Sequence, residues 1–63
     1  ISALDTVAQT FTLNYGGKTL PVNYAQAATL GKVEGTLANG ATAEVGLYGV
    51  NTGQFLARQV RVQ

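Results

Sequence analysis

The last third of the chain, residues 41–63, alternates apolar and polar side chains on both sides of a short turn. Alternation with a period of two is typical of β-strands that bury one face. The turn falls at Asn51-Thr52-Gly53, and a three-residue loop with glycine in last place favours a type I turn followed by a bulge. Such a loop would place Val50 opposite Gln54. The pattern therefore predicts a long β-hairpin in an all-β domain.

A β-bulge is expected in the second strand of this hairpin. Pairing that starts at the turn sets Leu47 opposite Ala57, but two residues further on it would set Val45 opposite a glutamine. One extra residue near Arg58-Gln59 brings Val45 opposite Val60 and keeps the apolar side chains on one face. A bulge also bends its strand, as the curvature of a small barrel requires.

An earlier hairpin is predicted at Gly16-Gly17, because two adjacent glycines can both adopt the positive φ of a type I′ turn. The register that this turn sets places the large apolar residues of both strands on the same face. Pro21 lacks an N–H, so it belongs where no ladder bond is needed, and the sheet should have a free edge beside it. The predicted pairs are Tyr15 with Lys18, Leu13 with Leu20, and Phe11 with Val22.

The segment between the hairpins leaves two alternatives open for residues 24–30. A capping Asn23, an alanine-rich middle and a final Gly31 favour one or two helical turns, whereas an extended crossing loop fits equally well. Residues 32–37 are expected to form a short strand, and Asn39-Gly40 a turn that leads into the closing hairpin.

At 63 residues the chain is expected to be one small module, 1–63, with a thin core. No cysteine or histidine is present, so neither a disulfide nor a zinc site reinforces that core. Residues 1–9 are the least determined: they pair with the last strand or stay loose. A start without methionine suggests a piece excised from a longer, multi-module protein. The bulky apolar residues available for the core are Phe11, Leu13, Leu20, Leu30, Leu37, Leu47, Phe55 and the tyrosines.

The side chains that most catalytic and metal sites use are missing. Without histidine or cysteine there is neither a triad base nor a thiolate nucleophile, and the carboxylates are three: Asp5, Glu34 and Glu44. A carboxylate hydrolase would need Glu34 and Glu44 side by side in a pocket. Glu44 fits better as an outward strand residue, which the bulge places opposite Arg61. We predict no catalytic residue, no metal ligand and no cofactor.

Exposed tyrosines and arginines are the remaining candidates for a binding surface. Tyrosine rings stack on sugars and bases, although covering an exposed sheet is the simpler role. A net charge of +1 attracts phosphate weakly, so nucleic acid is not an expected partner, and no segment is apolar enough for a membrane helix. The candidate residues are Tyr15, Tyr24, Tyr48, Arg58 and Arg61.

Four motifs follow one another in an order that resembles a known family. They are F-x-L at Phe11, V-x-Y at Val22, L-A-N-G-A-x-A-E-V-x-L-x-G over 37–49, and F-L-A-x-x-V-x-V over 55–62. This order is similar to that of the bacterial Domain of Unknown Function 5666 family. The resemblance implies a five- or six-stranded OB-like barrel, found mostly in exported proteins and lipoproteins and often in tandem copies. It supplies no catalytic residues, because no activity is established for the family.

Two functions from different classes fit these observations. The first is a non-catalytic structural or interaction module of an exported bacterial protein, periplasmic, secreted or lipid-anchored at the outer membrane. It would contact neighbouring domains, a protein partner or a second copy through strand edges near Pro21 and the outer sheet around Tyr48 and Arg58. The second is an OB-like ligand-binding module that holds a saccharide or single-stranded nucleic acid on exposed tyrosines.

Overall fold

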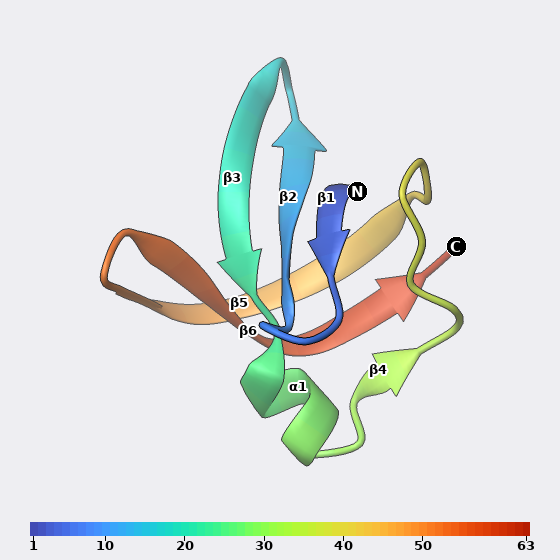
Figure 1. The fold of residues 1–63 in the computed structure, drawn as a ribbon, viewed down its shortest axis with the longest axis vertical. Helices are drawn as coiled ribbons and strands as arrows, with labels where there is room; N and C mark the ends of the chain where they lie inside the picture. Colours follow the sequence, from blue (N-terminus) through green and yellow to red (C-terminus); the bar gives the residue numbers. More distant parts are fainter.

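The computed structural model describes all residues from 1 to 63. Six strands form a single curled sheet, and one short helix connects two of them (Figure 1). The strand order is β1-β2-β3-β6-β4, and β5 pairs with β6 along its whole length. The sheet is curled into a half-barrel, which agrees with the predicted small all-β barrel built from two hairpins. The elements are β1 (Ser2–Asp5), β2 (Thr10–Tyr15), β3 (Lys18–Asn23), α1 (Ala25–Thr29), β4 (Val33–Glu34), β5 (Ala43–Asn51) and β6 (Gln54–Val62).

The β2–β3 hairpin has the register predicted from its two glycines. Gly16 and Gly17 have φ values of 57° and 79°, as a type I′ turn requires. The partners are those expected: Tyr15 with Lys18, Leu13 with Leu20, and Phe11 with Val22.

The edge predicted beside Pro21 is present. β3 runs parallel to β6 but pairs with it only through Val22 and Asn23. The stretch from Lys18 to Pro21 therefore has β2 on one side and no strand on the other. Pro21, which has no N–H to donate, sits where that donor is not needed.

The β5–β6 hairpin confirms the predicted bulge and corrects the predicted turn. Arg58 is the extra residue, since Gly46 pairs with Gln59 and Leu47 with Ala57. The turn has two residues, Thr52 and Gly53, with φ values of 54° and 77°. Val50 accordingly pairs with Phe55 rather than with Gln54.

A second bulge, at Tyr48, explains why the turn prediction was wrong while the pairing further along was right. Leu47 pairs with Ala57 and Gly49 with Leu56, which leaves Tyr48 without an opposite residue. The extra residue assigned to the turn from sequence thus lies inside β5. A type I′ turn matches the twist of the two strands, and Thr52 adopts the left-handed conformation that this turn needs.

The helical alternative for the connecting segment is correct. The Asn23 side chain accepts a hydrogen bond from the Ala25 N–H at 2.9 Å, and Gly31 follows the helix with a φ of 68°. The strand expected over residues 32–37 shrinks to the two residues of β4. Gly35, with a φ of 84°, ends it by turning the backbone.

β1 pairs with β2, which was neither of the two alternatives for residues 1–9, pairing with the last strand or staying loose. On its other side, β1 is held by the turn at Asn39-Gly40, which forms where the sequence predicts it. Gly40 N–H donates to the Ile1 carbonyl at 2.7 Å, the Ile1 nitrogen donates to the Ala41 carbonyl at 2.8 Å, and Leu4 N–H donates to Asn39 Oδ1 at 2.9 Å. These bonds bring the segment before β5 against β1 and narrow the opening of the half-barrel.

The core is thin, as expected for this length, but its members differ from the predicted set. Leu30 and Leu47 are 51% and 41% exposed, because the sheet curls around smaller residues and α1 covers one end of it (Figure 1). Tyr24 is buried and its ring stacks on Phe11 at 5.6 Å between centroids. The buried residues are Ile1, Phe11, Val22, Tyr24, Ala27, Ala57 and Val60.

Candidate functional site

The outer edge of β5 is the longest strand edge in the fold that has no partner strand beside it. β5 has nine residues, and β6 is its only partner. Val60 N–H donates to the Lys32 carbonyl at 3.0 Å, so it points away from β5, and the Val45–Val60 pair makes no ladder bonds. The N–H and C=O of Val45 therefore point outward from the sheet.

Val50 exposes its backbone in the same way. In a hairpin closed by a two-residue turn, the residues that flank the turn exchange the hydrogen bonds, and here these are Asn51 and Gln54. The next pair, Val50 with Phe55, is a non-hydrogen-bonded one. Donors and acceptors on both sides of the Tyr48 bulge are thus directed away from β6 and available to another strand.

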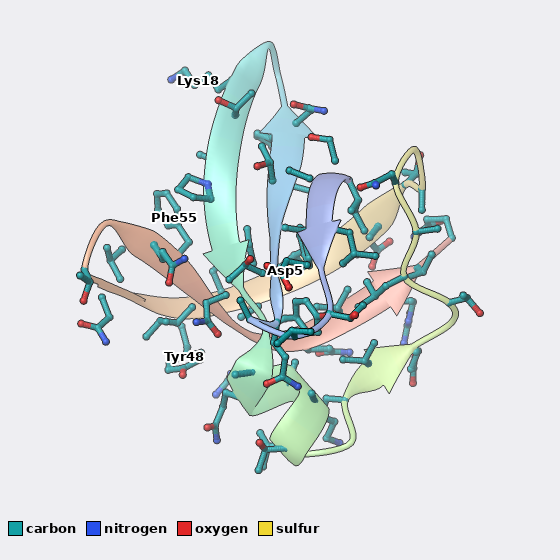
Figure 2. All side chains as sticks on the ribbon, in the orientation of Figure 1. Asp5, Lys18, Tyr48 and Phe55 are labelled. Carbon is teal, nitrogen blue, oxygen red and sulfur yellow. The ribbon has the colours of Figure 1, made fainter.

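Large apolar side chains gather on this same strand. Leu47, Tyr48 and Val50 are 41%, 48% and 64% exposed, and they account for half of the large exposed apolar residues of the protein. Figure 2 shows Tyr48 and Phe55 on opposite sides of the β5–β6 hairpin. The hairpin therefore offers apolar contact area beside its free backbone groups. We name the outer backbone edge of β5, together with Leu47, Tyr48 and Val50, the β5 edge.

The structure does not bring the three predicted tyrosines together. Tyr15 is exposed at the end of β2, beside the hairpin tip, and Tyr48 is exposed on β5. Tyr24 is only 5% exposed, so the prediction that it offers a ring to a ligand is wrong: its position directly before α1 turns it onto Phe11. Burial raises the pKa of Tyr24 above its usual value, and the negative charge of Asp5 raises it further.

Arg61 lies in the middle of a charged row that crosses three strands. It is opposite Glu44 in β5, as predicted, and opposite Glu34 in β4. Its Nε donates to Glu34 Oε2 at 2.9 Å, so the ion pair is made with Glu34. This hydrogen bond, followed by the charges of Glu34 and Glu44, raises the pKa of Arg61 above its usual value.

The same row separates the two carboxylates that a hydrolase would need side by side. Glu34 and Glu44 lie on strands that flank β6, with Arg61 between them, and both are exposed. An exposed ion pair in this position stabilises the fold little, because solvent screens it. The row therefore contains no paired carboxylates, and its one ion pair joins β4 to β6.

Surface hollows are shallow and hold no buried polar residue. One of about 240 Å³ lies over Gly46 and is lined by Glu44, Val45, Gln59 and Arg61. A second, of about 290 Å³, is lined by Leu30, Lys32, Arg58 and Gln59. The two predicted arginines therefore line different hollows.

No group of three or more carboxylate, histidine or cysteine side chains comes together in a way that could hold a metal ion. No helix has the length and apolar character needed to cross a bilayer.

The site that sequence reasoning missed is the β5 edge at Leu47 and Val50. The sequence feature that could have revealed it is the Thr52-Gly53 dipeptide. Once this dipeptide is recognised as a two-residue turn, it determines which way the N–H and C=O of Val50 point.

Comparisons with protein-family models, with curated proteins and with solved structures found no match for this protein.

Proposed function

We propose that this protein is a non-catalytic interaction module that binds an extended segment of a neighbouring domain or protein partner along the β5 edge. The observation that carries the proposal is the unpaired backbone at Val45 and Val50, combined with exposed apolar side chains on the same strand. An added strand would satisfy these donors and acceptors and cover Leu47, Tyr48 and Val50.

The composition of β5 supports a partner at this edge. Sheets that must stay single usually protect their outer strands with lysine, proline, inward charges or bulges. β5 contains neither lysine nor proline, its one charged residue is Glu44, and its one irregularity is the bulge at Tyr48. The edge of β3 is different, because Lys18 and Pro21 both lie on it.

The test is a titration of labelled protein with a synthetic peptide of residues 43–51, used as a generic strand, followed by NMR chemical shifts. We expect shifts at the amides of Val45 and Val50, and loss of these shifts in Val50→Lys, because a charge on an edge strand disfavours strand addition. Thr19→Lys, on the exposed part of β3, is the matched control and should bind as the wild type does. A protein that stays monomeric at high concentration and shows no β5 shifts would contradict the proposal.

A ligand-binding role has one remaining observation in its favour, the exposure of Tyr15 and Tyr48. Titration with oligonucleotides and with soluble glycans separates it from the interaction role. Shifts centred on the two tyrosines and absent from Val45 and Val50 would favour ligand binding. Shifts with the peptide alone would favour the interaction module.

We also propose that the module belongs to an exported bacterial protein similar to the Domain of Unknown Function 5666 family. The OB-like half-barrel and the motifs over 37–49 and 55–62 support this assignment. Fractionation of the source cells with an antibody against the module tests it. Signal in the periplasmic, membrane or secreted fraction is expected, and a signal confined to the cytosol would contradict the proposal.

A further inference from the structure

Asn39-Gly40 is the one asparagine–glycine pair in the sequence. The other asparagines, Asn14, Asn23 and Asn51, are followed by tyrosine, tyrosine and threonine. An asparagine before glycine is the sequence most prone to spontaneous deamidation, because glycine has no side chain to obstruct attack by its own backbone nitrogen on the asparagine amide. Both Asn39 and Gly40 are exposed. Solvent can therefore reach the pair.

The two reacting groups of this pair are both hydrogen-bonded, one to β1 and the other to Ile1, the residue directly before β1. The Gly40 nitrogen, which would attack, donates its hydrogen to the Ile1 carbonyl at 2.7 Å. The Asn39 side-chain amide, which would be attacked, accepts the Leu4 N–H at Oδ1 at 2.9 Å. Attack requires the Gly40 nitrogen to lose its proton and approach Asn39 Cγ. It therefore requires that these bonds break first.

We propose that Asn39 is a deamidation site whose reaction is gated by the docking of β1. When β1 opens, the Gly40 nitrogen gives up its proton to solvent and bonds to Asn39 Cγ. The bond between Asn39 Cγ and Nδ2 then breaks, and this nitrogen leaves as ammonia after taking up a proton from solvent. Water opens the resulting cyclic imide at either carbonyl, which yields aspartate or isoaspartate at position 39.

The two products differ in their effect on β1. Aspartate keeps an oxygen that can accept the Leu4 N–H, so β1 can dock again. Isoaspartate adds a methylene group to the backbone between residues 39 and 40, which displaces the Gly40 N–H from the Ile1 carbonyl. When an opening ends in isoaspartate, the hydrogen bonds that hold β1 against the Asn39-Gly40 turn are therefore weakened irreversibly.

The experiment follows deamidation of each asparagine by peptide mapping and mass spectrometry, in the folded protein and in the same protein unfolded in urea. In urea, Asn39 should react faster than Asn14, Asn23 and Asn51. In the folded protein it should react at about one tenth of that rate or less, because the rate scales with the population of the open form. Equal rates for Asn39 in the folded and unfolded protein, or no preference for Asn39 in urea, would overturn the proposal.

Two variants distinguish opening of β1 from global unfolding. Leu4→Ala removes packing of β1 against the core without removing its N–H, whereas Leu20→Ala removes comparable packing from β3, which does not pair with β1. We expect faster Asn39 deamidation in Leu4→Ala than in Leu20→Ala at matched global stability. Equal acceleration would contradict gating by β1.

The same proposal can be tested on the wild-type protein, without depending on whether either variant folds. Hydrogen exchange of the Leu4 and Gly40 amides gives the population of the open form directly. This population should equal the ratio of folded to unfolded deamidation rates at Asn39. After isoaspartate accumulates, both amides should exchange faster, and unchanged exchange in the isoaspartate form would contradict the release of β1.

Discussion

At the scale of single residues, Gly35 holds the backbone in a place that admits no side chain. Its φ is 84°, and a Cβ built there would lie 2.9 Å from the Val62 Cβ and 3.1 Å from the Val62 carbonyl oxygen. Gly31 has a similar φ of 68°, but no atom lies within 4 Å of the position of its Cβ. The two glycines separate the cost of a left-handed backbone from the cost of a close approach.

Replacement of Gly35 by alanine should therefore destabilise the fold more than the same change at Gly31. For Gly31→Ala we expect a loss of about 1 kcal/mol in the free energy of unfolding, the cost of the left-handed conformation. For Gly35→Ala we expect about 2 to 4 kcal/mol, because contact with Val62 is added to that cost. Urea unfolding of both variants measures the difference, and equal losses would show that the approach to Val62 relaxes freely.

Tyr24 makes the stability of the fold sensitive to alkaline pH. Burial and the charge of Asp5 raise its pKa in the folded state above the usual 10.0, so the unfolded protein releases the phenolic proton first. The contribution of Tyr24 to the free energy of unfolding is therefore complete below the unfolded-state pKa of 10.0. It is lost as the pH rises through the higher pKa of the folded state.

We expect Tyr24→Phe to retain more of its neutral-pH stability in this alkaline range than the wild type does. Urea midpoints measured from neutral pH upward test this. The exposed Tyr15→Phe serves as the control and should follow the wild-type pH dependence. Parallel curves for the wild type and Tyr24→Phe would mean that ionisation of Tyr24 does not contribute.

At the scale of elements, turn chemistry made part of the fold predictable. Two adjacent glycines determined the β2–β3 register, and the mismatch of Val45 with a glutamine located the Arg58 bulge. The bulge at Tyr48 left no such mismatch. A three-residue turn and a two-residue turn with a bulge in β5 give the same pairs from Leu47 to the start of the strand.

The partner of β1 and the burial of Tyr24 were not predictable for a related reason. β1 has four residues and an irregular register, too short a pattern to distinguish one neighbouring strand from another. A tyrosine in the sequence fits an exposed ring and a buried one equally well. Only the three-dimensional position of α1 against β6 and the stacking on Phe11 decide it.

α1 has five residues and depends on its first turn for stability. Asn23 precedes Tyr24, the N-cap of α1, and Asn23→Ala removes the side-chain acceptor for the Ala25 N–H, so it should cost about 1 kcal/mol of unfolding free energy, as loss of one hydrogen bond does. Asn23→Asp keeps this acceptor but also loses the 3.4 Å contact of Nδ2 with Gln54 Oε1, so the difference between the two variants isolates the bond to Ala25. Urea unfolding measures both, and equal stabilities of the two variants would assign the effect to Gln54 instead.

At the scale of the whole molecule, the half-barrel has edges of different character. β1 is covered by the turn at Asn39-Gly40, and the exposed part of β3 carries Lys18 and Pro21. β5 has no such cover over its nine residues. A thin core and a free edge on the same small domain support the proposal that the protein pairs with another polypeptide along β5.

The most direct test of a free β5 edge that binds a partner is amide hydrogen exchange along β5, measured in dilute and in concentrated protein. We predict fast exchange at Val45 and Val50 in dilute solution, slow exchange at Gly46 and Gly49, whose groups face β6, and slower exchange at the two valines as the concentration rises. Val45 and Val50 amides that are already protected in the dilute monomer, or that do not respond to concentration or to an added strand, would contradict it.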